Sequence, residues 1–142
     1  MKTATFCSRT EKGQSAPVFA VVVTALVLFI VGVMDYMVTT ARAMEAVGIA
    51  DLSAHAGVQE LNVLPNGVIE ISPGGPGAAA ALYARQRKSY TQLANVYCGR
   101  INSRPACEVA VRVKSAGFLI PQHWITVRAV GYMDYGSTRG GQ

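Results

Sequence analysis

Residues 17–34 read PVFAVVVTALVLFIVGVM, and this stretch decides how the rest of the chain is organised. It contains no charged side chain, and Thr24 is its only polar residue. As an α-helix it would be about 27 Å long, close to the hydrocarbon thickness of a bilayer. In lipid, a helix lets one segment satisfy its own backbone hydrogen bonds. We therefore predict a membrane-spanning helix, in preference to a core helix that a chain of 142 residues could hardly enclose.

A cleaved secretory signal is the other interpretation of an apolar stretch near an N-terminus. This stretch is longer than the apolar core of an ordinary signal peptide. The residues that follow it, Met-Asp-Tyr-Met-Val at 34–38, do not resemble a small-residue cleavage site. We therefore expect a retained anchor.

The charges near the span predict its orientation. The chain has a formal net charge of +5, and Lys2, Arg9 and Lys12 precede the span. Beyond the span, Arg42 is the only basic residue before Arg85. Because positive charge concentrates on the cytoplasmic side of a span, we expect a single-pass membrane protein. Its N-terminus would lie inside and its C-terminal domain outside.

The densest basic group, Arg85, Arg87 and Lys88, is too small to track a phosphate backbone. A solvated helix face is the favoured interpretation of these three residues, and no nucleic-acid partner is expected.

The cysteines agree with export. Cys7 lies in the leader, whereas Cys98 and Cys107 lie in the exported part, where an oxidising compartment favours a disulfide. We predict that they close a loop with the sequence GRINSRPA. No metal site is expected, because His55 and His123 are far apart in sequence and the chain has no second cysteine pair.

The helix is expected to continue beyond the membrane over residues 35–61, which contain no proline. Apolar residues recur along this segment in one drifting stripe: Met37, Ala41, Met44, Val47, Leu52 and Val58. Small residues flank the stripe and would let another element approach closely. Two interpretations stay open: the stripe packs against sister subunits, or it docks on the chain's own C-terminal domain.

The remaining residues predict a small α+β domain with a short antiparallel sheet. Together with the preceding segments, the expected organisation is a leader at 1–16, a span at 17–34, a helical extension at 35–61 and the domain at 62–142. Within the domain we expect a turn at 65–67, a strand at 68–71, a loop at 72–77, a second helix at 78–97 capped by Gly99, and strands at 108–114 and 123–132 that pair as a hairpin.

No catalytic motif is present in the sequence: it has no HExxH, no GxSxG and no phosphate-binding loop. We therefore expect no enzyme, no catalytic residue and no cofactor. Asp35, at the membrane edge, is the most suggestive ionisable residue. It could mark a functional contact, and interfacial solvation would explain it equally well.

Several segments resemble the TadE/TadG-like proteins of the tight-adherence (Tad, or Flp) pilus system. Gly13-Gln14, followed by Phe19-Ala20, is similar to the family's "GQ…VEFAL" start. The run GVMDY at 32–36 and the run ADLSAHAGV at 50–58 look like the acidic end of the family's span and the "ADAAALAGA"-like stretch after it. The resemblance covers residues 12–60, and the rest of the chain only in outline.

The resemblance implies a minor pilin or pseudopilin with a small pilin-like domain, located in the bacterial cytoplasmic membrane or at the cell surface. Pilin subunits, other pilus-assembly proteins, membrane lipid and a prepilin peptidase would be its partners. The peptidase would cut between Gly13 and Gln14. One departure stands out, because the glutamate usual five residues after that glycine is replaced by Val18. A structural filament subunit and an accessory subunit of another membrane or secretion complex are the alternatives.

Overall fold

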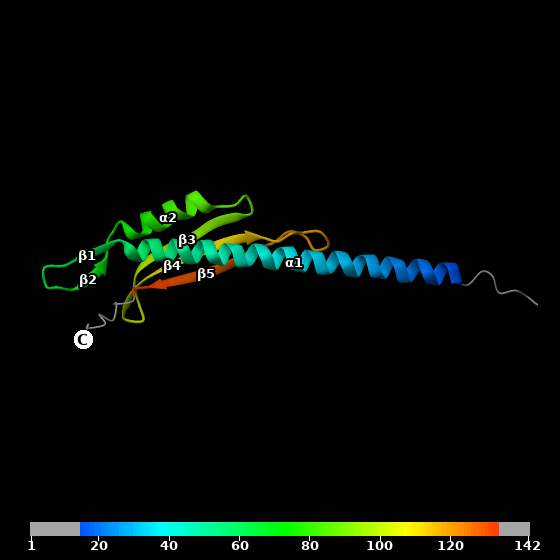
Figure 1. Ribbon diagram of the computed structural model, residues 1–142, viewed down its shortest axis with the longest axis horizontal. Coiled ribbons are helices and arrows are strands. Elements are labelled where there is room, and N and C mark those ends of the chain that lie inside the picture. The colour runs from blue at the N-terminus through cyan, green and yellow to red at the C-terminus, as the bar shows by residue number, and fades with distance from the viewer. Residues whose placement is uncertain (1–14, 134–142) are drawn as a thin grey trace, which may run out of the picture.

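The molecule is built on one long helix. The computed structural model describes residues 15–133, and the processing site expected at Gly13 and Gln14 lies outside them. Helix α1 (Ser15–Gln59) runs without a break through 45 residues, a length of about 67 Å. The predicted continuation of the apolar helix beyond residue 34 is therefore confirmed (Figure 1). The helix ends at Gln59, slightly before the expected boundary at Leu61, which begins the first strand.

The second half of the chain forms an α+β domain, as predicted. Its elements are β1 (Leu61–Val63), β2 (Ile69–Ile71), α2 (Gly75–Gln86), β3 (Thr91–Ile101), β4 (Arg104–Lys114) and β5 (Trp124–Tyr132). The strands make a two-stranded sheet, β1-β2, and a three-stranded sheet, β3-β4-β5, both antiparallel. The predicted strand at 68–71 and the hairpin of the last two strands are both confirmed.

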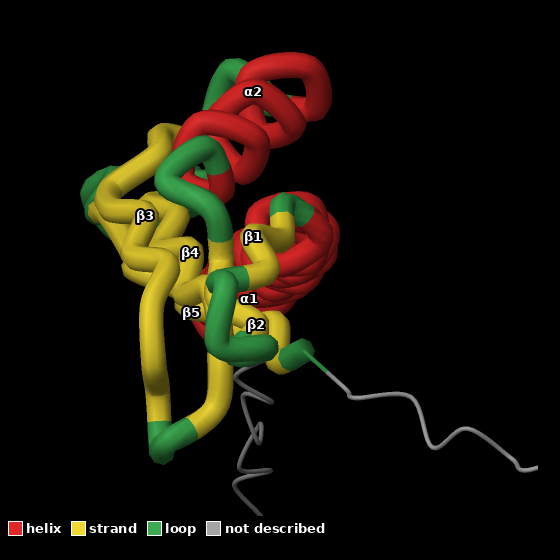
Figure 2. Tube along the Cα trace, turned by 90° about the vertical axis from the view of Figure 1, so that its left-hand side faces the viewer, coloured by secondary structure: helices red, strands yellow, loops and turns green. Residues whose placement is uncertain are grey.

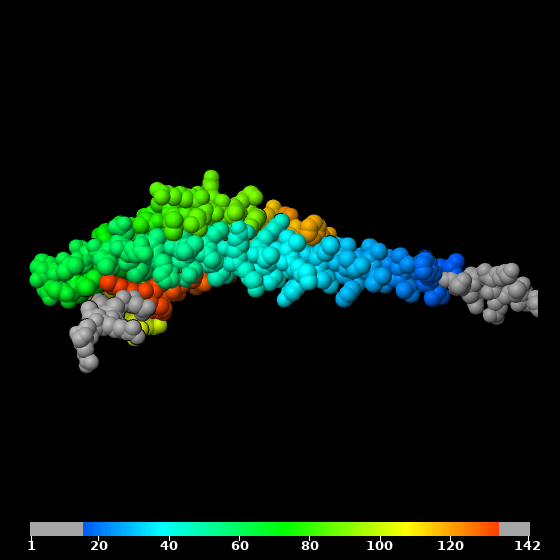
Figure 3. Space-filling model, in the orientation of Figure 1, coloured from blue at the N-terminus to red at the C-terminus, as the bar shows by residue number. Residues whose placement is uncertain are grey.

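Both helices cover the same face of the three-stranded sheet. The second half of α1 lies against β4 and β5, and α2 lies beside α1 toward β3 (Figures 1 and 2). The first half of α1 extends beyond the domain, so that the molecule is an elongated rod with a domain along one half (Figure 3).

The core forms where small residues of α1 meet the valines of β4. Four α1 residues are fully buried: Ala46, Ala50, Ser53 and Ala54. They share the core with Val109, Val111 and Val113, which alternate along β4 and face the helices. Small side chains let the helix axis approach the sheet closely. The approach is close at Gly131, where a Cβ atom would lie 3.0 Å from the carbonyl carbon of Ala54.

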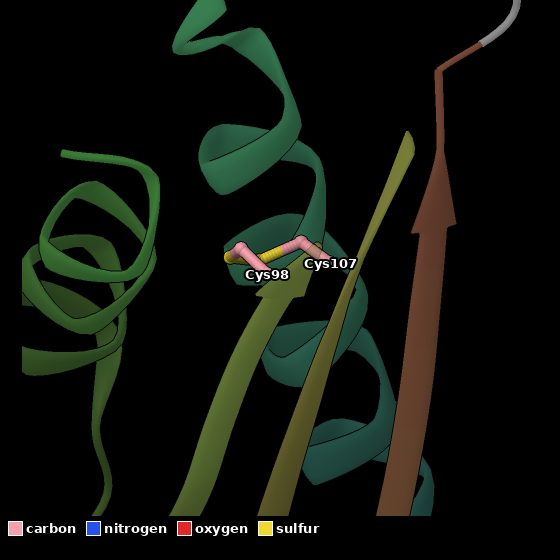
Figure 4. The surroundings of a disulfide bond; sticks show 2 residues. All are labelled: Cys98 and Cys107. Carbon is pink, nitrogen blue, oxygen red and sulfur yellow. A yellow bond between two sulfur atoms is a disulfide. The ribbon is translucent and has the colours of Figure 1, made fainter. Parts of the chain in front are cut away.

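The predicted disulfide between Cys98 and Cys107 is present. The two residues are directly opposite each other in the β3-β4 ladder, with their Cα atoms 4.0 Å apart (Figure 4). The bridged segment is a regular hairpin and not the irregular loop expected from its sequence. Its turn residues, Asn102 and Ser103, have φ angles of 52° and 65°, the left-handed conformation that a tight hairpin turn requires.

The expected second helix at 78–97 is wrong in its second half. Helix α2 ends at Gln86, and Thr91 begins strand β3, so Gly99 lies within that strand and caps no helix. A bulge between Leu93 and Asn95 interrupts the ladder with β4. The bulge shifts the side-chain alternation, so Leu93 and Val96 both pack on the core although they are three residues apart. Apolar residues three positions apart are also typical of one face of a helix, so the sequence predicted a helix here.

The start of the second helix also differs from its expected place. The loop expected at 72–77 ends at Gly74, because α2 begins at Gly75 and has a proline in its first turn. Proline suits that position, where its missing N–H needs no intrahelical partner. A glycine-rich stretch therefore forms the first turn of a helix.

Candidate functional site

The candidate site is the surface of α1 that the domain does not cover. No part of the most apolar window of α1 is buried within the molecule, and the helix is long and apolar enough to cross a membrane. Phe19 and Phe29 expose 70% and 69% of their surface. Such a surface needs an apolar environment, which the described part of the chain does not itself provide.

The exposed apolar surface continues past the predicted span. Five residues of the predicted stripe are exposed: Met37, Ala41, Met44, Val47 and Leu52. Only the sixth, Val58, is buried, at 7% exposure. The chain's own domain docks on the other face of α1, through Ala46, Ala50 and Ala54. The two uses considered for this helix therefore fall on different faces: the small residues bind the domain, and most of the stripe is free of it.

Asp35 joins α1 to the loop at 115–123 that connects β4 to β5. Its carboxylate is 5% exposed. Oδ1 accepts a hydrogen bond from the backbone N–H of Gly117 at 3.0 Å, and Oδ2 accepts from Leu119 and Ile120, each at 3.3 Å. Asp35 therefore contacts backbone donors of its own chain.

The charge state of Asp35 follows from these contacts. Burial by itself raises the pKa of this carboxyl, but the backbone N–H donors of residues 117–120 lower it more. The net result is a pKa below the ordinary value, and Asp35 is ionised at neutral pH. A carboxylate that accepts several N–H groups is a stronger acceptor than a neutral oxygen.

Two further residues of α1 bind the same loop. The hydroxyl of Thr39 accepts a hydrogen bond from the backbone N–H of Ala116 at 3.1 Å. The guanidinium of Arg42 donates to the carbonyl of Ser115 at 3.1 Å. Asp35, Thr39 and Arg42 are spaced three or four residues apart, so they lie on one face of the helix and form a continuous polar seam.

A mostly apolar cavity of about 500 Å³ lies between α1 and this loop. It is lined by Gly32, Asp35, Tyr36, Thr39, Ser115, Leu119, Ile120 and His123. The cavity therefore lies where the predicted span meets the domain.

A second polar cluster surrounds Glu45, which lies about one turn beyond Arg42 on α1. The hydroxyl of Tyr90 donates a hydrogen bond to the carboxylate of Glu45, which also pairs with Lys88 at 3.1 Å. Arg42 lies 5.0 Å from the centre of the Tyr90 ring. The hydrogen bond from Tyr90, followed by that from Lys88, lowers the pKa of Glu45, and the same bond to Glu45 raises the pKa of Tyr90. Tyr90 and Lys88, which lie outside α1, therefore both contact the helix through Glu45.

The histidines have local partners. His55 lies on α1 with its Nδ1 atom 2.9 Å from the carbonyl of Asp51. His123 lies beside Ser115, whose hydroxyl accepts a hydrogen bond from the His123 backbone N–H at 3.0 Å. Within residues 15–133, no group of three or more metal-ligating side chains comes together.

Sequence reasoning missed the apolar loop beside Asp35. Phe118, Leu119 and Ile120 form an uncharged triplet between Gly117 and Pro121, and each is at least 45% exposed. The signal was present in the sequence, because three large apolar residues in a row between turn residues are unusual for a loop at a protein surface.

The family resemblance stays a prediction. The segments that carry it within the described residues, Phe19-Ala20, GVMDY and ADLSAHAGV, all lie on α1. Comparisons with protein-family models, with curated proteins and with solved structures found no match to this chain.

Proposed function

We propose that this chain is a membrane-anchored pseudopilin or minor pilin that assists assembly of a Tad/Flp-type pilus. It acts by packing against other proteins and not by catalysis. Its N-terminus lies in the cytoplasm, α1 crosses the cytoplasmic membrane once, and the α+β domain lies outside. The resemblance in residues 12–60 is the reason for proposing a pilus system. The exposed apolar surface of α1 supports a role in packing against other proteins.

The observation that carries this proposal is the exposed apolar stripe beyond the span. Met37, Met44 and Leu52 expose 64%, 70% and 52% of their surface. Leu52 lies about 27 Å along the helix beyond Met34, the last residue of the predicted span. Lipid hydrocarbon does not extend that far if residues 17–34 fill the bilayer. A protein surface, and most simply another long helix, is then the partner that covers the stripe.

The composition of the stripe fits a helix partner. Methionine side chains are flexible and polarisable, and they adapt to the irregular surface of a neighbouring helix. The domain is bound to the opposite face of α1, so a partner could reach the stripe without displacing it. The chain therefore presents one lipid-facing segment and one protein-facing segment in a single helix.

The alternative role is that of a structural filament subunit. It is favoured by the complete exposure of the span, because sister helices in a filament core could cover that surface as well as lipid. Val18 favours the assembly role, because a carboxylate at this position is what would pair with the N-terminal amine of the next subunit in a pilin.

The test of the stripe uses the substitution Met44→Glu in the full-length chain, produced in its native host in place of the wild type. We expect normal membrane insertion and folding, because Met44 does not contact the domain core, but loss of surface pili. Gln92→Glu, which places the same charge on an exposed position of β3, is the matched control and should leave pili unchanged. Normal piliation of the Met44→Glu strain would overturn the proposal.

The role within the pilus system is tested on the native protein. Intact-mass analysis reports whether the chain begins at Gln14, and shearing of surface filaments reports whether the chain is part of them. An assembly factor stays with the membrane fraction, whereas a filament subunit appears in the sheared material. A reporter fused after Gln142 should face outward, and an inward-facing reporter would contradict both roles.

A further inference from the structure

We propose that the loop between β4 and β5 inserts Phe118, Leu119 and Ile120 into the outer leaflet of the membrane that α1 crosses. The loop gives the domain a second contact with lipid beside the helix. The proposal rests on α1 being a membrane anchor and not on any role in pilus assembly.

The first argument is exposure. Phe118, Leu119 and Ile120 are 64%, 45% and 61% exposed, although they are consecutive and large. No Asp, Glu, Lys or Arg occurs between Lys114 and Arg128, so the loop carries no formal charge at neutral pH. An exposed apolar cluster without charges marks a site where something apolar binds.

The second argument is the position of the loop along α1. A Cβ atom on Gly32 would lie 3.7 Å from a methyl group of Leu119. Gly32 belongs to the last turn of the predicted span, so the tip of the loop lies level with the end of the hydrocarbon-length segment. In Figures 1 and 3 the loop, drawn in orange, extends past the end of the sheet and lies along α1 toward its N-terminal half.

The third argument is that the loop's backbone is prepared for an apolar environment. Irregular backbone is tolerated at membrane depth only where its polar groups are satisfied by protein. The carboxylate of Asp35 accepts the N–H groups of Gly117, Leu119 and Ile120. Pro121 has no N–H to satisfy. The loop can therefore turn its side chains to lipid while three of its N–H groups stay paired to Asp35.

The residues around the loop match a membrane–water interface. Tyr36 is 73% exposed on α1 just after Asp35, and Trp124 is 50% exposed at the start of β5. Tyrosine and tryptophan are enriched where the hydrocarbon meets the headgroups. Tyr36 lines the same cavity as Leu119 and Ile120, and Trp124 lies where the loop ends and β5 begins.

Lipid is favoured over a protein as the occupant because of the face of α1 that is involved. Asp35 and Thr39 hold the loop, whereas Met37 is two residues from each, which turns its side chain about 200° away around the helix. The stripe that we assign to a protein partner is therefore on the opposite side of α1. The tip of the loop instead lies beside Gly32, level with the end of the segment that we assign to lipid.

The experiment measures the depth of single tryptophans in the full-length protein. Trp124→Phe removes the only native tryptophan. In that background, Phe118→Trp reports the loop, Phe29→Trp reports the span, and Val63→Trp reports an exposed position of β1 at the far end of the domain. Each variant is reconstituted into phosphatidylcholine–phosphatidylglycerol vesicles whose acyl chains carry bromine either near the headgroup or near the chain end. Circular dichroism and intact mass with the disulfide closed verify folding.

We expect Phe118→Trp to lose most of its fluorescence with bromine near the headgroup and less with bromine near the chain end. Val63→Trp should keep its fluorescence in both. If Phe118→Trp behaves like Val63→Trp while Phe29→Trp is quenched, the anchor stands and the proposal is overturned. Blue-shifted emission that bromine does not quench and that depends on protein concentration would assign the loop to a protein contact instead. Absence of quenching in Phe29→Trp would remove the anchor and, with it, the proposal.

Discussion

A methyl group on Gly57 would lie 2.6 Å from the Sγ atom of Cys107 and 3.1 Å from that of Cys98. Helix α1 therefore crosses directly over the disulfide, with no side chain between its backbone and the sulfur atoms. The same methyl group would lie 3.1 Å from the carbonyl oxygen of Gly75, the first residue of α2. Three separate parts of the chain thus converge on one position that only glycine fits.

Gly57→Ala should destabilise the domain. The added methyl group must displace the disulfide or the helix, and overpacking of this kind lowers the free energy of unfolding by about 1–3 kcal/mol. Gly48→Ala is the matched control, because a methyl group there meets nothing within 4 Å and alanine favours helix more than glycine does. Denaturant unfolding in detergent micelles without reductant measures both. Equal stability of the two variants would contradict the close contact.

Removal of the disulfide should destabilise the domain and also relieve the constraint on Gly57. The double substitution Cys98→Ala, Cys107→Ala should lower the free energy of unfolding by about 2–4 kcal/mol, because the bridge no longer restricts the unfolded chain. Adding Gly57→Ala in that background should have a smaller effect than in the wild type, since the sulfur atoms are gone. A double-mutant cycle of unfolding free energies measures this coupling, and strict additivity would argue against it.

Asp35→Asn should release the loop between β4 and β5. An amide keeps one acceptor oxygen and turns an NH₂ group toward backbone donors that the carboxylate accepted. Hydrogen–deuterium exchange of residues 117–120 should therefore accelerate. Asp51→Asn is the control, because the side chain of Asp51 is 53% exposed and accepts none of these bonds. Unchanged exchange in Asp35→Asn would contradict the role assigned to this carboxylate.

The same contact predicts a pH dependence. The pKa of Asp35 in the folded protein lies below its ordinary value of 3.8. A group with a depressed pKa contributes its full stabilisation above the unfolded value and loses it as the pH falls through the folded value. The wild type should therefore lose stability below about pH 4 with a component that Asp35→Asn lacks. Acid titration of both proteins by circular dichroism tests the difference.

Tyr90 should titrate above the ordinary range of a tyrosine. Its hydrogen bond to Glu45 raises the pKa of the phenol above 10.0, so the stabilisation from this bond is present below that value and is lost as the pH rises through the raised pKa. Comparing the ultraviolet absorbance titrations of the wild type and Tyr90→Phe isolates this group. Glu45→Gln should move the titration of Tyr90 back toward lower pH. An unchanged titration of Tyr90 in Glu45→Gln would show that Glu45 does not cause the raised pKa.

The sequence was most informative where composition alone determines structure. The apolar run at 17–34 and the absence of proline to Leu61 predicted α1, and period-two alternation of valines predicted β4. The strand β3 was not predictable, because the bulge after Leu93 destroys that alternation and becomes visible only when β4 is beside it.

The candidate site was only partly predictable. Asp35 was singled out as a carboxylate at the end of a span, but its hydrogen-bond partner Gly117 is 82 residues away in the sequence. Likewise, the apolar pattern on α1 did not reveal which face would bind the domain. The domain packs on the small residues around Ala50, which let the helix backbone approach the sheet closely.

Helix α1 passes from the exposed apolar segment to the sheet without interruption, and Asp35, Thr39 and Arg42 hold the domain to it. The domain is therefore fixed in rotation relative to α1. In the proposed arrangement, the orientation of the domain around the membrane normal follows from how α1 sits in the bilayer. Each extra residue placed in the anchor would advance the helix by about 1.5 Å and turn it by about 100°. A single inserted residue would thus rotate the domain relative to the N-terminal part of α1 and change the face that it presents to its neighbours.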